Sequence, residues 1–301
     1  MRLSRLELLT GKGGVGRSTV SLALARAAVQ RGESVLLLEA EEGPERAAAL
    51  GRLIGVTMSG EARQVEPRLW LAQLRALEGH ASFLKELIPA GPLIQAALSS
   101  KALRRFLESA PAMYELGLFQ QLWCALQDQR FDRVILDLPA TGHALALLQL
   151  PEQLQRLLNG GPLVDRLMRG RAGLAGSDRT RLWIVTRPEQ TVISEALELA
   201  QQLKEDGLSP SGFLVNGWSR LPLNDAETEQ LGTLLACAPK SDEAIGLRRH
   251  EEAPMLLARL GEVAATYTLP LRPAPSSERP PPAWYQPLCE ALQGLFEGGE
   301  R

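Results

Sequence analysis

The amino-acid sequence predicts an α/β fold in which a mostly parallel, twisted sheet carries helices on both faces. Short apolar runs of strand length alternate along the chain with longer segments of helical periodicity. A glycine-rich loop joins the first apolar run to the first helical segment. The runs expected to form strands are residues 4–9, 35–38, 69–73, 133–136, 182–186, 213–215 and 266–271.

The glycine-rich loop carries the spacing of a phosphate-binding P-loop, G-x-x-x-x-G-basic-Ser/Thr, with Arg17 where lysine is usual. Glycines let consecutive backbone N–H groups turn inward around an anion, and the helix that follows points its positive end at the same place. The fold class is therefore expected to be that of a P-loop NTPase. The loop residues expected to bind nucleotide are Gly11, Gly13, Gly14, Val15, Gly16, Arg17, Ser18 and Thr19.

The helical segments follow from apolar spacing. The segment after the loop is apolar at Val20, Leu24 and Ala28 and is expected to end at Gly32. Further helical segments are expected within 80–129 and 150–168, over 191–205, and from Tyr285 to Phe296. A stretch with five prolines, residues 273–282, is read as an extended connector before the final helix.

Composition limits the location and the partners. With 33 basic and 35 acidic residues the net charge is −2, which provides no general attraction to nucleic acid or to an anionic membrane. No run approaches the roughly 18 apolar residues of a membrane span, and the N-terminus does not read as a signal peptide. The three cysteines are widely separated, as in reduced cytoplasmic proteins. We expect a cytoplasmic protein with no nucleic-acid partner and no direct membrane insertion.

The segment Asp137 to Pro151 contains D-L-P-A-T-G-H and a later L-P. It resembles the D-T-A-P-T-G-H…L-P switch segment of the arsenical pump-driving ATPases, which the tail-anchored-protein targeting ATPases share. Three further segments of the chain also resemble segments of these families: residues 185–189 (V-T-R-P-E), 213–216 and 268–271. These are deviant Walker A P-loop NTPases. The resemblance implies a single P-loop ATPase domain over 1–272, with helical insertions near 80–129 and 150–168. Residues 273–301 would add the proline-rich connector and a C-terminal helix of the same domain.

The resemblance also implies roles for individual residues, with ATP and Mg²⁺ as cofactors. Lys12 stands where the extra loop lysine of the family reaches across a dimer to the partner's nucleotide. Ser18 would ligate Mg²⁺ through its hydroxyl, and Asp137 would hold the ion through water. Glu41 aligns with the aspartate that orients the attacking water; the less favoured alternative is a solvated acid in its acidic cluster. The remaining assignments are the switch residues Thr141, Gly142 and His143, adenine recognition by Asn216, and closure over the base by Pro270.

Two departures from the family pattern predict slow hydrolysis by the expected catalytic residues Lys12, Arg17, Glu41 and Asp137. A guanidinium is wider than an ammonium, and a glutamate moves its carboxylate by about an ångström, an error that alone can cost about a hundredfold. The chain is therefore expected to be a slow dimeric ATPase. Two alternatives stay open: a degenerate subunit that binds nucleotide and pairs with an active paralogue, or a non-hydrolysing regulatory or scaffold module.

The expected partners are a second copy or a paralogue, together with a protein client or a membrane-transport partner. The apolar helices within 80–129 form either a client-binding groove or core. Cys124, Cys237 and Cys289 are too far apart in sequence to suggest an arsenite site, and no C-x-x-C pair suggests zinc. Membrane-binding partitioning ATPases share the fold, but the acidic final helix disfavours anionic lipid.

Overall fold

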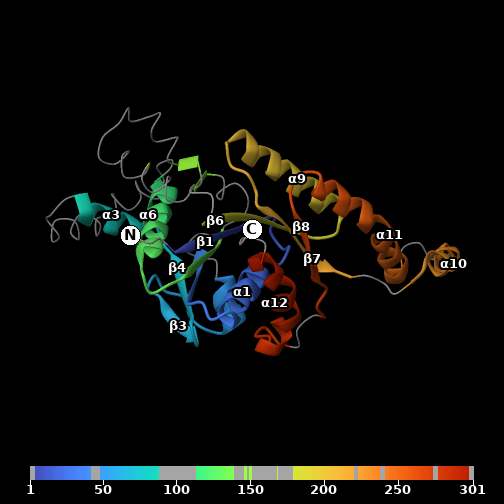
Figure 1. The fold of residues 1–301 in the computed structure, drawn as a ribbon, viewed down its shortest axis with the longest axis horizontal. Coiled ribbons are helices and arrows are strands. Elements are labelled where there is room, and N and C mark those ends of the chain that lie inside the picture. Colours follow the sequence, from blue (N-terminus) through green and yellow to red (C-terminus); the bar gives the residue numbers. More distant parts are fainter. Residues whose placement is uncertain are drawn as a thin grey trace.

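The computed structural model describes residues 4–41, 48–87, 113–138, 146–147, 149–150, 168, 179–219, 223–237, 241–273 and 277–297. Its strands form one eight-stranded sheet in the order β3-β4-β2-β5-β1-β6-β7-β8 (Figure 1). Every neighbouring pair is parallel except β3 with β4. The predicted α/β fold of a P-loop NTPase is confirmed. The strands are β1 (Arg5–Thr10), β2 (Val35–Ala40), β3 (Arg63–Glu66), β4 (Leu69–Leu74), β5 (Arg133–Asp137), β6 (Thr180–Thr186), β7 (Gly212–Trp218) and β8 (Thr266–Pro270).

Helices cover both faces of the sheet (Figure 1). One face packs against α1, α2 and α12, and the other packs against α6, α9 and α11. The buried side chains of these layers form two clusters, one on each side of the strands. The helices are α1 (Arg17–Gln30), α2 (Ala49–Ile54), α3 (Ala76–Leu87), α6 (Met113–Gln127), α9 (Gln190–Glu205), α10 (Asp225–Leu235), α11 (Asp242–Gly261) and α12 (Pro282–Glu297).

The structure adds one strand that the sequence does not predict, β3. Its residues, Arg-Gln-Val-Glu, contain a single apolar side chain, so no apolar run marks the segment. It pairs antiparallel with β4 at the edge of the sheet, where a polar strand can face water. The final helix starts at Pro282, three residues before the predicted Tyr285, because proline is well tolerated in a first helical turn.

The segment 80–129 contains α3 and α6, while residues 88–112 lie outside the described part of the chain. Several apolar side chains of α6 are buried in the core beside the sheet: Leu116, Leu118, Phe119, Leu122 and Leu126. For α6, core is therefore the correct reading. Of the predicted helical segment 150–168, only Leu150 and Met168 are described, so that prediction falls largely outside the described residues.

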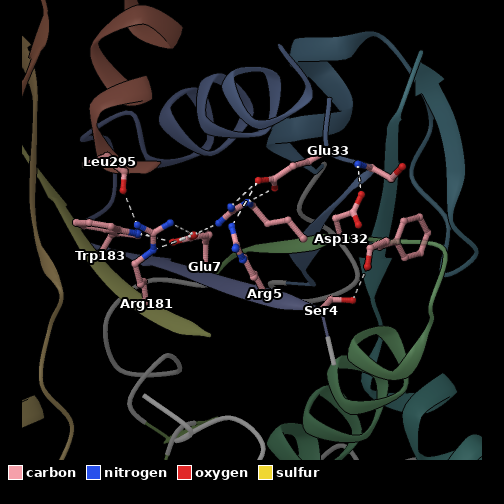
Figure 2. Close-up of polar contacts among 11 residues, drawn as sticks. Ser4, Arg5, Glu7, Glu33, Asp132, Arg181, Trp183 and Leu295 are labelled. Atoms are coloured by element: carbon pink, nitrogen blue, oxygen red, sulfur yellow. Dashed lines mark hydrogen bonds and ion pairs between the residues drawn. The ribbon is translucent and has the colours of Figure 1, made fainter. Parts of the chain in front are cut away.

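A cluster of charged side chains is buried near the amino-terminal ends of the central strands (Figure 2). Glu7 of β1 accepts hydrogen bonds from Trp183 Nε1 (2.7 Å), Arg181 Nη2 (2.7 Å) and Arg133 Nη1. Arg133 also donates to Glu33 at 2.6 and 2.9 Å, and its side chain is fully buried. We call Glu7, Glu33, Arg133, Arg181 and Trp183 the Glu7 network. It joins β1, β5 and β6 by side-chain contacts.

The C-terminal end of α12 contacts the two arginines of the Glu7 network. Arg181 Nη1 donates to the Leu295 carbonyl at 2.6 Å (Figure 2). The Phe296 ring lies 4.6 Å from the Arg133 guanidinium carbon and 5.8 Å from that of Arg181. An aromatic face attracts cations, so these contacts tie the last helix to the sheet.

Candidate nucleotide-binding site

The loop between β1 and α1 has a backbone that requires glycine at two close approaches. Gly11 has a φ of 152°, and a Cβ there would lie 2.3 Å from the Val185 carbonyl oxygen. Gly16 has a φ of 86° in the left-handed region and immediately precedes α1. A Cβ on Gly16 would lie 2.3 Å from Asn216 Nδ2. The glycines therefore let the loop pack closely against residues of β6 and β7.

A cavity of about 560 Å³ lies beside this loop, at the carboxyl ends of the parallel strands. Pockets of roughly 300–1,000 Å³ are typical of small-molecule sites, so this one is large enough for a nucleotide. Its walls come from the loop, from the ends of β2 and β4, from α2 and from the segment before α12. The lining residues are Lys12, Gly13, Gly14, Gly16, Arg17, Ser18, Thr19, Glu39, Ala40, Ala48, Ala49, Arg52, Leu53, Gln73 and Glu278.

Arg17 pairs with the acid at the end of β5. Its Nε donates to Asp137 Oδ1 at 2.6 Å, and its Nη1 donates to the Gly11 carbonyl at 3.1 Å. The Ser18 hydroxyl donates to Asp137 Oδ2 at 2.5 Å. β1 and β5 are neighbours with Leu9 opposite Asp137, so the loop and the acid meet at one end of the sheet. The sequence predicted that Ser18 and Asp137 meet at one magnesium ion, but not that the Arg17 guanidinium contacts the Asp137 carboxylate.

The two predicted magnesium ligands lie together, and their chemistry suits the ion, because Mg²⁺ prefers oxygen donors. The arrangement does not suit it. Asp137 is 1% exposed, and its two oxygens already accept bonds from a cation and from the Ser18 hydroxyl. Mg²⁺ would have to displace the Arg17 guanidinium before Asp137 could order its shell.

Two acids near the end of β2 differ in what they face. Glu39 lines the cavity, and its carboxylate accepts the backbone N–H groups of Ala49 (2.7 Å) and Leu50 (2.8 Å) at the start of α2. Glu41, which the sequence assigns to the attacking water, is not among the described residues lining the cavity. Burial raises the pKa of Glu41; the charge of Arg75 lowers it and that of Glu78 raises it again.

Lys12 lies at the mouth of the loop and pairs with Glu195 of α9 in the same chain. Both side chains are partly exposed, and Lys12 also lines the cavity. Its expected role in a partner's site would require this contact to break. The structure thus places Lys12 within the loop, with its ammonium paired to an acid of its own chain.

Asn216 and Pro270 lie on the neighbouring strands β7 and β8. The Asn216 amide donates to the Val15 carbonyl at 2.9 Å, so this side chain contacts the backbone of the loop. Neither residue is among those lining the cavity. The switch residues Thr141, Gly142 and His143 lie outside the described residues.

Sequence reasoning did not assign three charged residues of the cavity: Glu39, Arg52 and Glu278. Glu39 was considered only as a neighbour of Glu41, although its place one strand from Asp137 in register would have been a signal. Arg52 belongs to α2, a helix of only six residues. Nothing local marks Glu278, which comes from the proline-rich segment far along the chain.

A sequence profile of the anion-transporting ATPases matches residues 4–169, more than half of the chain and all of the loop and the Asp137 strand. This chain belongs to the anion-transporting ATPase family. The predicted resemblance is therefore confirmed. Within the family, this member is 27% identical over 286 residues to an arsenical pump-driving ATPase of Acidiphilium multivorum, covering 88% of this chain and 46% of that protein.

Two further relatives show the breadth of the family. ATPase BagA of Mycobacterium tuberculosis is 27% identical over 224 residues, which cover 70% of this chain and 64% of BagA. An ATPase ASNA1 homolog of Babesia bovis is 30% identical over 167 residues, which cover 53% of this chain and 42% of that protein. This family member thus spans less than two thirds of the length of these relatives.

The described residues contain neither a membrane-spanning helix nor a cluster of metal-binding side chains. No helix among them combines the length and the apolar character needed to cross a bilayer. Within the same residues, no three His, Cys, Asp or Glu side chains are grouped to hold a metal ion.

Proposed function

We propose that this family member is a cytoplasmic, slowly hydrolysing ATPase that binds ATP in the 560 Å³ cavity. The observation that carries the proposal is the placement of the glycine-rich loop: its amides and the start of α1 border a cavity of nucleotide size. Among the described residues, three cations line the same cavity: Lys12, Arg17 and Arg52. Amides at a helix start and nearby cations are what a polyphosphate requires.

The proposed slowness comes from the charges. Phosphoryl transfer depends almost entirely on positioning and electrostatics. Arg17 is held by Asp137 rather than directed at the cavity alone, and Glu41 lies outside the cavity lining. Glu39 is the better placed acid to orient an attacking water, because it lines the cavity. Magnesium at Ser18 and Asp137 stays a prediction, since it requires Arg17 to move.

We propose that the working unit is a dimer of like chains or of paralogues, in which Lys12 leaves Glu195 to reach the partner's nucleotide. Dimer closure would couple the nucleotide state to a protein client or to a membrane-transport partner. We do not extend the arsenical role of the named relatives to this chain. Cys124 and Cys289 belong to different helices, Cys237 follows a third, and Cys289 is buried.

A second candidate function is that of a degenerate subunit that binds ATP and activates a paralogue. The Arg17–Asp137 pair favours it, because a neutralised acid is poorly suited to hydrolysis. The non-hydrolysing scaffold is the limiting case of the same idea.

ATP turnover and molar mass by light scattering, with and without nucleotide, test these proposals on wild type and Arg17→Lys. Slow turnover and an ATP-dependent dimer support the ATPase. A large gain in turnover for Arg17→Lys would favour the degenerate subunit, whereas loss of turnover would show that arginine is the working residue. A chain that binds no ATP would contradict both.

A matched pair of variants identifies the acid. Glu39→Gln is expected to lower turnover by about a hundredfold, as loss of a water-orienting group does, while Glu41→Gln changes it by less than about threefold. The reverse order would return the role to Glu41. Because Glu39 also holds the start of α2, ATP affinity is measured for both variants to separate binding from turnover.

A further inference from the structure

The carboxylate of Asp137 is fully engaged before any ligand arrives. One oxygen accepts Arg17 Nε at 2.6 Å and the other accepts the Ser18 hydroxyl at 2.5 Å. The Asp137 side chain is 1% exposed and that of Arg17 is 13% exposed, so little water competes for the pair. The acid expected to order a metal shell is therefore occupied by a cation of the chain itself.

Arginine is suited to this position in a way that lysine is not. Its planar fork lets Nε face Asp137 while Nη1 faces the Gly11 carbonyl at 3.1 Å. The two acceptors lie at the ends of neighbouring strands, and one guanidinium spans both. A compact, strongly hydrated ammonium cannot match this planar fork and loses more by leaving water. The geometry holds the guanidinium in place through two strands of the sheet.

The charges of the site change accordingly. A carboxylate beside a P-loop ordinarily carries the negative charge that attracts Mg²⁺. Here the Arg17–Asp137 pair is neutral overall, and a divalent ion beside it would face a like charge with little screening by water. A polyphosphate faces a more favourable surface, made by the loop amides together with Lys12 and Arg52. Arg52 lines this cavity from α2, so its charge can face a phosphate there.

We infer that this site takes its nucleotide as the metal-free polyphosphate, with the Arg17 guanidinium in the place that Mg²⁺ would occupy. The inference rests on the proposed nucleotide-binding function, because it concerns the same cavity. It makes Arg17 a specificity-determining residue: it selects the uncomplexed nucleoside triphosphate or diphosphate over the magnesium complex.

Calorimetric titration of the full chain with a non-hydrolysable ATP analogue, in EDTA and in excess Mg²⁺, tests the inference. Wild type is expected to bind about tenfold or more weakly in excess Mg²⁺ than in EDTA, because most of the analogue is then in the magnesium complex, which the site rejects. Arg17→Lys, which releases Asp137 for the metal, is expected to gain about tenfold or more from Mg²⁺. Arg52→Gln is the matched control, with weaker binding by a similar factor in both conditions.

A second measurement observes the metal directly. Electron paramagnetic resonance of Mn²⁺ with the analogue is expected to show little protein-bound Mn²⁺ for wild type and a bound signal for Arg17→Lys. A bound Mn²⁺ signal in wild type, or a wild-type affinity that does not fall in excess Mg²⁺, overturns the inference while the ATPase proposal survives. No binding by wild type in either condition would overturn the proposed function itself. The wild-type measurements alone test the inference, even if Arg17→Lys fails to fold.

Discussion

Two clusters of arginine and carboxylate lie at opposite ends of the central strands. The Glu7 network lies near their amino-terminal ends, and the Arg17–Asp137 pair lies at the carboxyl ends of β1 and β5. Both contain a nearly inaccessible acid: Glu7 and Asp137 are each 1% exposed. They differ in what surrounds the arginine. Arg133 is fully buried beneath Phe296, whereas Arg17 borders a large cavity.

The difference shows what makes a buried ion pair structural. In the Glu7 network each donor has a protein acceptor, and none of its residues is among the described residues that line the cavity beside the loop. Its residues therefore stabilise one arrangement of β1, β5, β6 and α12. The Arg17–Asp137 pair has the same chemistry, but the cavity offers its arginine a second partner. The predictions that follow test this contrast.

The largest effect is expected for Glu7→Gln. The variant keeps the shape of the side chain but removes the charge that faces Arg133 and Arg181. The buried guanidinium of Arg133 and the partly exposed one of Arg181 then lack the counter-charge of Glu7. Breaking a buried ion pair from one side costs about 3–5 kcal/mol, and we expect about 3 kcal/mol in the free energy of unfolding. Urea unfolding followed by circular dichroism measures it.

The matched control is Arg187→Gln, which removes a half-exposed pair with Glu189 at 3.5 Å. A surface pair contributes little, and we expect a change of less than about 0.5 kcal/mol. Similar losses for Glu7→Gln and Arg187→Gln would mean that the Glu7 network does not stabilise the fold as its burial suggests.

Asp137→Asn is expected to cost less, about 1–2 kcal/mol, although Asp137 is as buried as Glu7. The Arg17 guanidinium, once released, can turn into the cavity and regain water or a phosphate. Repeating the unfolding with saturating ATP analogue separates the two regions, because the nucleotide should stabilise Asp137→Asn at least as much as wild type. If Asp137→Asn lost as much free energy of unfolding as Glu7→Gln, and nucleotide did not change that loss, the Arg17–Asp137 pair would be as structural as the Glu7 network.

Phe296→Leu tests whether the contacts between α12 and the arginines of the Glu7 network stabilise the fold. The ring lies near the guanidiniums of Arg31, Arg133 and Arg181, at 5.4, 4.6 and 5.8 Å. Leucine keeps the apolar cover but not the attraction to cations, and we expect a loss of about 1 kcal/mol. Faster amide hydrogen exchange at the end of α12 would accompany it. If Glu7→Gln and Phe296→Leu were simply additive, the two would not be coupled.

Features marked by a contiguous run of residues could be predicted from the sequence, whereas those made by distant residues could not. The apolar run Val134 to Leu136 is local and ends in an acid, so both β5 and the importance of Asp137 were predictable. Strand β3 was not, since its polar residues form a strand only by pairing with β4. The loop was predictable because its motif is contiguous. The cavity lining by Glu278 was not, because it depends on how the segment before α12 packs.

The Glu7 network could not be predicted either, because its residues lie far apart in the sequence. A single glutamate in the run Leu6 to Thr10 gives no sign of its partners, which follow 126 and 174 residues later in the chain. Register alone brings them together: Arg5, two residues before Glu7, pairs with Arg133, and Glu7 itself pairs with Arg181. The pairing of Arg17 with Asp137 likewise required the loop geometry.

A smaller, pH-dependent effect is expected at Glu41. Burial raises the pKa of its carboxyl above the ordinary value of 4.5, with Arg75 opposing and Glu78 reinforcing the shift. The folded state therefore binds its proton longer than the unfolded state does. As the pH rises from about 4.5 through the raised pKa, wild type should lose stability relative to Glu41→Gln, and the two should run parallel below that range. If the stability profiles of wild type and Glu41→Gln ran parallel at every pH, the Glu41 carboxyl would be solvated rather than partly buried.

The smallest effect concerns reactivity rather than stability. Burial raises the pKa of the Cys289 thiol to about 11, and its Sγ donates to the Ala23 carbonyl of α1 at 3.4 Å. Since the thiolate is the reactive form, an alkylating reagent near pH 8 should modify exposed Cys237 first and leave Cys289 unmodified in the native protein. Mass spectrometry of the digested protein measures both. In Phe296→Leu the rate at Cys289 should rise, because loosening the end of α12 opens its contact with α1. An unchanged rate there would show that the helix stays in place without the aromatic contact, and that the hydrogen bond from Arg181 to Leu295 suffices to hold it.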